Sequence, residues 1–223
     1  RRLANEAIDL DPGFGLAYSL LGWTYLVEGV FGWSQSPEKS LSQAVEFAKK
    51  AIALQDLLDC AHGLLAYFYS LKGEWDRAVA EARRAVEIAP NSERAHVYLG
   101  QVLIFAGRPV EAIPILDRAI RLNPFPTTTT LAYLGLAHLF AGHHEEAISM
   151  CKKAMNVNPK YLFAHIYLTA TYSAAGRDEE AHAEAQELLK LNPKFYLDSL
   201  KLKFKKETDR DLLIRGLRKA GLE

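Results

Sequence analysis

The chain has 223 residues, of which 49% are hydrophobic, and its 27 basic and 27 acidic residues give a formal net charge of zero. This composition is typical of a folded protein rather than a disordered one, and it lacks the basic excess that nucleic-acid binding requires, so we expect no nucleic-acid partner. Cys60 and Cys151 stand far apart and predict no disulfide framework, which fits a reducing, cytoplasmic compartment.

The chain opens with Arg1-Arg2-Leu3, without an initiator Met or a signal-peptide pattern, so we expect it to be part of a longer protein. Residues 1–14, "RRLANEAIDLDPGF", are predicted to form the second helix of a partial helix pair. That helix would leave Leu3, Ala7 and Leu10 without a covering partner. We therefore expect possible homo-oligomerisation through this N-terminal helix.

Residues 15–58 are predicted to form the first complete helix pair. Leu21 and Gly22 lie in its first helix, Gly29 in its turn, and Ala44 in its second helix. Between Gly29 and Ala44 there are ten more residues than the later pairs have at the same place, which indicates an insertion at the turn.

The inserted residues contain a helix start. Ser36 supplies a capping hydroxyl, Pro37 suits the first helical position, and Glu38 complements the helix dipole. We expect the second helix to begin near Pro37, about two turns earlier than in the other pairs. Phe31-Gly32-Trp33 would form a short aromatic loop that either folds back over this helix or contributes to a partner-binding rim.

Four further pairs follow at residues 59–92, 93–127, 128–161 and 162–195. Each reads as a helix, a turn with Gly, a second helix and an exit marked by Pro. The period is shown by leucines that recur at a nearly constant spacing, namely Leu65, Leu99, Leu134 and Leu168. Small residues let the two helices of a pair approach closely, and no pair buries its apolar face alone, so the pairs must stack.

Residues 196–223 leave this pattern and are predicted to form a C-terminal cap of one or two helices. Lys201, Lys203, Lys205 and Lys206 make a local basic run there. It is either a solvated cap surface or a contact for an acidic partner or a membrane surface.

The segments "YSLLGWTY", "HGLLAYFY", "HVYLGQVL", "LAYLGLAH" and "HIYLTATY" resemble the tetratricopeptide repeat, whose length of about 34 residues matches the period. The resemblance implies an all-α, right-handed superhelical solenoid. The insertion "FGWSQSPE" and the ending "GLRKAGL" are similar to the C-terminal repeat regions of bacterial class III adenylate/guanylate cyclases and related multidomain signalling proteins.

In that family the first helix of each pair lines the concave face, at the second, fifth, ninth and twelfth positions of the repeat. The resemblance therefore implies that a protein or peptide partner binds in a mainly apolar groove. The positions in this chain are Leu16, Ser19, Trp23, Tyr67, Arg94, Val97, Gln101, Ala132, Leu136, Phe163, Ile166 and Ala170.

No pattern predicts catalysis, a metal or another cofactor. His62, His96 and His165 share one repeat position, which favours packing, and His143 to Glu146 read "HHEE" at an ordinary helix start. HExxH, P-loop, GxSxG and GxGxxG motifs do not occur, and no apolar run is long enough to span a membrane. We therefore expect a non-catalytic interaction scaffold. The alternatives are a regulatory or oligomerising segment of a nucleotide cyclase and a metal-dependent enzyme that uses the histidines.

Overall fold

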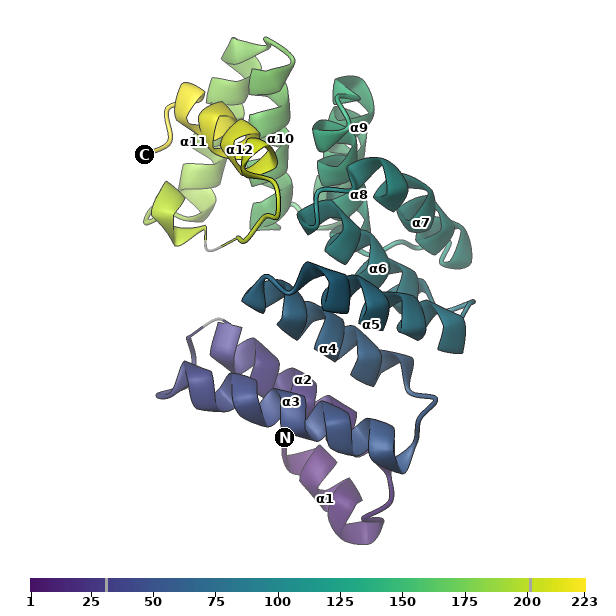
Figure 1. Ribbon diagram of the computed structural model, residues 1–223. Coiled ribbons are helices and arrows are strands. Elements are labelled where there is room, and N and C mark those ends of the chain that lie inside the picture. The colour runs from purple at the N-terminus through teal and green to yellow at the C-terminus, as the bar shows by residue number, and fades with distance from the viewer. Residues whose placement is uncertain (31, 201) are drawn as a thin grey trace. The chain divides into compact units, whose positions relative to one another are not determined.

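The structure is a computed structural model that describes residues 1–30, 32–200 and 202–223. Within these ranges it contains twelve α-helices and one short 3-10 helix, and no strand (Figure 1). Most helices pack against the next helix along the chain, which follows after a short turn. The predicted all-α class of paired helices is confirmed.

The chain divides into two compact units, residues 1–102 and 103–223. The first unit is built on two helix pairs, α2 with α3 and α4 with α5, and on an N-terminal helix. Its helices are α1 (Arg2–Leu10), α2 (Gly15–Val30), α3 (Pro37–Leu54), α4 (Asp59–Lys72), α5 (Trp75–Ile88) and the greater part of α6 (Glu93–Phe105).

The second unit begins with the end of α6 and contains the pairs α8 with α9 and α10 with α11, followed by the C-terminal helix. Its further elements are α7 (Pro109–Leu122), α8 (Thr128–Phe140), α9 (His144–Val157), α10 (Leu162–Ala174), α11 (Asp178–Leu191), the 3-10 helix η1 (Leu197–Ser199) and α12 (Glu207–Lys219).

Two kinds of small residue explain the pairing. Gly73 has a φ of 80° at the end of α4, a left-handed conformation that other residues adopt at a cost, and it turns the chain into α5. The second helices then present alanines to the first helices, as Ala78, Ala82 and Ala85 of α5 do with no exposed surface. These methyl groups allow the close approach that the sequence pattern predicts.

The insertion lengthens both helices of the first pair. Helix α3 begins at Pro37 as predicted, but this is one turn earlier than in the other pairs, not two. Gly29 lies inside α2, not in the turn. Glycine allows α3 to approach closely here, since a Cβ would come within 2.8 Å of Leu41 and 3.0 Å of the Pro37 carbonyl oxygen. Gly32, with a φ of 68°, makes the turn instead.

The predicted serine cap is also corrected. Ser36 occupies the N-cap position but its hydroxyl makes no capping bond; its N–H donates to Ser34 Oγ at 3.1 Å, and Ser40 Oγ lies 2.8 Å from the same atom. Trp33 is 73% exposed and does not fold back over α3, while Phe31 lies outside the described residues. Helix α8, by contrast, has a side-chain cap, since Thr127 Oγ1 accepts from the Thr130 N–H.

Candidate protein-binding face on the first helices

Three aromatic side chains from successive first helices meet in the first unit. Trp23 of α2 stacks on Tyr98 of α6 with ring centroids 5.4 Å apart, and Tyr67 of α4 lies 6.4 Å from Trp23. The indole Nε1–H donates to the Cys60 carbonyl oxygen at 3.0 Å, which fixes the ring. We call these three residues the aromatic cluster.

Gly63 makes room for the cluster. A Cβ at this position would lie 2.1 Å from Tyr98 Cδ2 and 2.2 Å from Cε2, so the Tyr98 ring rests directly on the α4 backbone. Burial raises the pKa of the Tyr98 phenol above its ordinary value, with Arg94 opposing the shift. Tyr98 is not among the predicted face residues. Gly63, in the preceding repeat, is the feature that could have indicated that a large ring packs against α4 at this point.

The other predicted residues of this unit differ in exposure. Leu16, Trp23, Tyr67, Val97 and Gln101 are half-buried, and Arg94 is exposed. Ser19 is fully buried, where its hydroxyl donates to Cys60 Sγ at 3.1 Å. The accessible part of the face is therefore aromatic and aliphatic, with one cation on α6.

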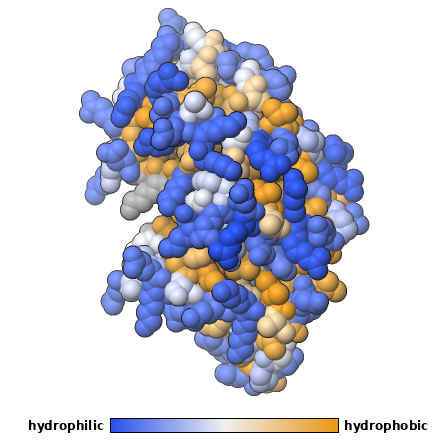
Figure 2. Space-filling model, viewed as in Figure 1, coloured by the Kyte–Doolittle hydropathy of each residue, from blue (hydrophilic) through white to orange (hydrophobic). Residues whose placement is uncertain are grey.

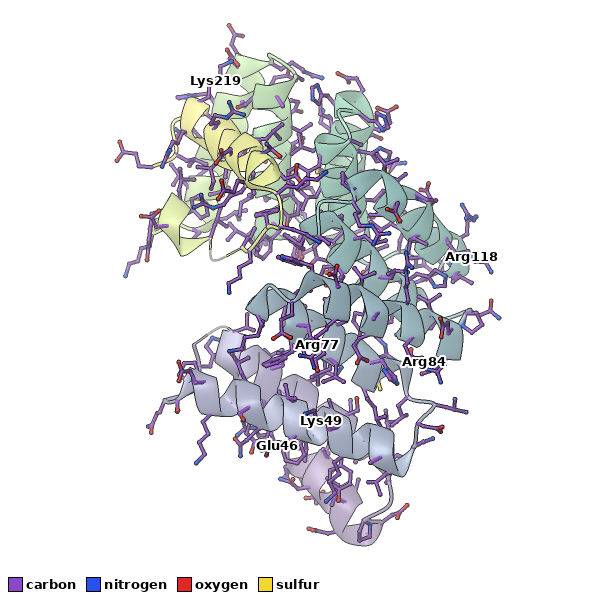
Figure 3. All side chains as sticks on the ribbon, viewed as in Figure 1. Glu46, Lys49, Arg77, Arg84, Arg118 and Lys219 are labelled. Atoms are coloured by element: carbon purple, nitrogen blue, oxygen red, sulfur yellow. The ribbon has the colours of Figure 1, made fainter. Side chains whose placement is uncertain are left out.

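Charged side chains instead gather on the second helices. Figure 3 labels Glu46 and Lys49 on α3, Arg77 and Arg84 on α5, and Arg118 on α7. Arg77 is tied to its own helix pair, since it donates to Tyr69 Oη at 2.7 Å and its guanidinium lies 4.0 Å from the centre of that ring. The second helices thus supply much of the charged, solvated side of each pair.

In the second unit the predicted face residues are covered. Ala132, Leu136, Ile166 and Ala170 have at most 1% of their surface exposed, and only Phe163 is half-buried. Ala170 is covered by α12, because a Cβ on Gly216 would lie 3.0 Å from Ala170 Cα. The sequence did not predict that the chain's own C-terminal part would lie against this helix.

The Tetratricopeptide repeat family model matches residues 71–127 and 138–203, which together make up more than half of the chain. The chain belongs to the tetratricopeptide repeat (TPR) family. The narrower similarity to cyclase regions has no support from this match.

Two known proteins illustrate what the chain is similar to, one in sequence and one in structure. Anaphase-promoting complex subunit 7 of Dictyostelium discoideum is 36% identical over 59 residues, so the chain spans about a tenth of the length of that curated relative. The structure is similar to PilW, a "widely conserved type IV pilus biogenesis factor", with a TM-score of 0.72, 19% identity, and coverage of 92% of this chain and 90% of PilW.

A second solved structure, YrrB, is described as "a TPR protein with an unusual peptide-binding site". It gives a TM-score of 0.55 at 21% identity and covers 86% of this chain and 93% of YrrB. At these identities the likeness establishes the TPR fold. Across the described part of the chain, no helix is both long and apolar enough to cross a membrane.

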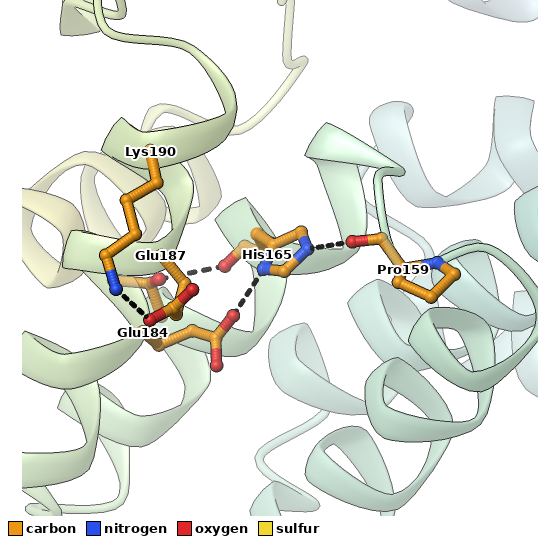
Figure 4. A network of polar contacts seen from close by, with 6 residues as sticks. Pro159, His165, Glu184, Glu187 and Lys190 are labelled. Carbon is orange, nitrogen blue, oxygen red and sulfur yellow. Dashed lines mark hydrogen bonds and ion pairs between the residues drawn. The ribbon is translucent and has the colours of Figure 1, made fainter.

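The histidines of this TPR protein that share one repeat position are buried, as predicted for packing residues, but two of them also have acidic partners. His62 Nδ1 lies 2.7 Å from Glu81 Oε2, and His165 Nδ1 lies 2.5 Å from Glu184 Oε1. His165 Nε2 donates to the Pro159 carbonyl oxygen at 2.9 Å (Figure 4). Both glutamates follow their histidine at the same separation along the chain, and this repeated spacing could have predicted the pairs.

Burial also shifts the pKa of a further histidine and of a cysteine thiol. His138 and His143 meet at 3.3 Å between their Nδ1 atoms, and burial together with His143 lowers the pKa of His138. No group of three or more possible metal ligands occurs among the described residues. Burial raises the pKa of the Cys151 thiol to about 12, and its sulfur packs where a Cβ on Gly135 would lie 2.6 Å away.

Proposed function

We propose that this TPR protein is a non-catalytic scaffold that binds a peptide or helix of a partner protein on the first helices of its first unit. The observation that carries this proposal is the aromatic cluster of Trp23, Tyr67 and Tyr98, which the first helices of three successive pairs bring together. Large aromatic side chains supply much of the affinity at protein interfaces. The proposal divides the chain into five TPR repeats at 15–58, 59–92, 93–127, 128–161 and 162–195, preceded by a partial repeat and followed by a cap. It places the protein in the cytoplasm.

The chemistry of the face limits the ligand. Its accessible side chains are apolar or uncharged except for Arg94. An amphipathic helix or an extended apolar segment therefore matches it better than a strongly charged one, and an acidic residue in the ligand would find Arg94. The peptide-binding site named in the description of YrrB gives general support for peptide recognition by a protein of this fold.

The proposal is tested by removing two rings of the cluster. We expect Trp23→Ala with Tyr67→Ala to weaken partner binding at least tenfold, because truncating central aromatic residues costs about 2 kcal/mol or more. The measurement is capture of partners from the source organism's lysate, followed by titration of the strongest. Circular dichroism verifies that the variant stays helical.

Two further variants make this test specific. Leu54→Ala removes an apolar side chain that is 42% exposed at the end of α3, a second helix of the same unit, and should leave binding unchanged. Arg94→Glu reverses the one charge on the face without removing packing, and it should weaken an acidic ligand. Partners that remain bound to both the double variant and Arg94→Glu would place the binding site elsewhere.

A second candidate role is that of a regulatory or oligomerising C-terminal segment of a multidomain nucleotide cyclase, a bacterial signalling protein. Helix α1 favours the oligomerising part of this role. None of its residues is buried, and Leu3 and Leu10 are 71% and 89% exposed (Figure 2 shows hydrophobic surface among hydrophilic residues over α1). Ile8 and Ala7, by contrast, are half-buried, and Ile8 packs toward Tyr18 and Leu58.

This role predicts self-association through α1. Light scattering should show a dimer that Leu3→Glu with Leu10→Glu converts to a monomer, since the two leucines lie on the exposed side of the helix. Leu57→Glu, at a residue that is 64% exposed outside α1, is the matched control. A monomer at high concentration would remove the oligomerising role, and a reading frame without an upstream cyclase domain would remove the cyclase.

A further inference from the structure

The C-terminal segment, which we define as Leu202–Leu222, lies on the first helices of the second unit. Figure 1 draws α12 across α10, and the contact between Gly216 and Ala170 agrees. Helix α10, which also packs against α9 and α11, is buried from Ala164 to Ser173. The segment follows α11 after an irregular stretch and therefore reaches this face as a ligand would, not as another helix pair.

The first part of the segment is anchored by an aromatic side chain. Phe204 lies between Phe105 at the end of α6 and Phe140 at the end of α8, with ring centroids 5.1 and 5.7 Å apart. The adjacent Lys205 N–H donates to the Phe105 carbonyl oxygen at 2.8 Å. That carbonyl is in the last turn of α6, where helix geometry leaves acceptors without an intrahelical donor. A main-chain bond beside a seated aromatic ring is typical of an extended peptide in a groove.

The helical part is anchored by a close backbone approach. A Cβ on Gly216 would lie 3.0 Å from Ala170 Cα and 3.1 Å from the Ala170 carbonyl oxygen. Ser173, one turn beyond Ala170, is buried and donates its hydroxyl hydrogen to the Gly216 carbonyl oxygen at 2.8 Å. Glycine is thus required at this point of α12 for the helix to seat.

The sequence along this face changes in step with its covering. The five repeats share one position on their first helices. It recurs at the spacing of the repeat, which the insertion lengthens once, and it is occupied by Trp23, Tyr67, Gln101, Leu136 and Ala170. This position carries a bulky aromatic ring in the first two repeats and a single methyl group in the last repeat, where α12 docks. The small residue therefore accommodates the segment, because a ring at Ala170 would occupy the place of Gly216.

The docked segment also contains a polar defect. Asp209 Oδ2 is buried and, among the described residues, has no hydrogen-bond partner. Burial raises the pKa of this carboxyl group, while Lys206 and Thr208 oppose the shift. A buried acceptor without a donor costs free energy in the folded protein. At the other end of the segment Leu217 and Leu222 are buried, and Lys219 of α12, labelled in Figure 3, forms an exposed ion pair with Asp178 of α11 at 2.7 Å. The ion pair itself stabilises little.

We propose that the first-helix face of the second unit is a second peptide-binding site, and that its resident ligand is the chain's own C-terminal segment, held in place reversibly. A competing ligand needs the same chemistry, namely a phenylalanine followed by a helix with glycine on its docking side. This site is distinct from the aromatic cluster, so the two proposals fail independently.

The test uses the full chain and a fluorescent peptide of residues 202–222. We expect the double variant Phe204→Ala with Gly216→Leu to bind this peptide at least tenfold more tightly than the unmodified protein, whose site is occupied. The variant should also be cut faster by trypsin at Arg210 and Arg215, because its own segment is released. Arg218→Leu adds the same side chain on the exposed side of α12 and should behave like the unmodified protein.

Equal peptide binding by the unmodified protein and the released variant, or no binding by either, would overturn the proposal. Hydrogen exchange of the unmodified protein gives a readout that needs no variant. Amides of α12 should exchange at least tenfold faster than those of α10, and Asp209→Asn should slow them because a neutral amide costs less to bury than a carboxylate. If α12 exchanges as slowly as α10, the segment is a fixed part of the core.

Discussion

Valine at position 63 is expected to destabilise the protein by about 3 kcal/mol, the upper end of the range for an overpacked core. The Cβ alone would lie 2.1 Å from the Tyr98 ring, far inside van der Waals contact. The ring has little freedom to move because it stacks on Trp23, whose indole is hydrogen-bonded to the Cys60 carbonyl oxygen. The free energy of unfolding from urea titration measures the effect.

The source of this strain is identified by a second substitution. Gly63→Val with Tyr98→Leu should recover at least half of the lost stability, because the shorter side chain leaves room for the new methyl groups. Val97 stands at the equivalent position one repeat later, so valine itself is compatible with this place in a first helix. A Gly63→Val protein as stable as the parent would show that Tyr98 does not rest on α4 in solution.

The recurring small residues predicted the helix pairs because their roles are local. A glycine at Gly73 or Gly107 must adopt a left-handed conformation to end a helix, and that requirement is visible in any sequence with the same period. The insertion broke the period, and there the prediction was only partly right. Gly29 has the spacing of a turn residue but serves as the close contact between two lengthened helices.

The docking of the C-terminal segment could not be predicted from local sequence patterns. Phe204 stands among lysines in a stretch without helical periodicity, so nothing local indicates that its ring is seated between Phe105 and Phe140. The burial of Ile166 and Ala170 also depends on elements far away in the sequence. The repeat pattern predicted that these residues lie on the first helix of a pair, as α10 is, but it did not predict what covers them.

For the pair of His165 and Glu184, one feature was predicted from the sequence and another was not. The repeat position of His165 predicted its burial, but the prediction did not include its acidic partner. With Nε2–H donated to Pro159, the imidazole must also carry a proton on Nδ1 to donate to Glu184, so the contact is that of a histidinium with a carboxylate. The side chains are 5% and 13% exposed.

Replacing Glu184 with leucine is expected to cost about 3–5 kcal/mol of stability near pH 6, because it leaves a buried imidazolium without its counter-charge. Replacing both partners should cost much less. The fourth repeat already has Leu131 and Met150 at these two positions, so His165→Leu with Glu184→Met copies a pair that the fold accepts. We expect the double variant to lie within about 1.5 kcal/mol of the parent, the usual limit for volume-conserving changes.

The pH dependence gives the sign of the interaction. The hydrogen bond to Glu184 is the largest cause that raises the pKa of His165 above its ordinary value, with the Pro159 carbonyl adding to it and desolvation opposing it. Because the folded protein holds this proton more tightly than the unfolded chain, the stabilisation is complete below about pH 6.5, the ordinary pKa of histidine, and is lost as the pH rises through the raised pKa. The stability of the parent relative to the double variant should therefore fall between pH 6 and pH 9 in urea titrations. A difference that is constant over this range, or that grows with pH, would mean that His165 is neutral in the folded protein.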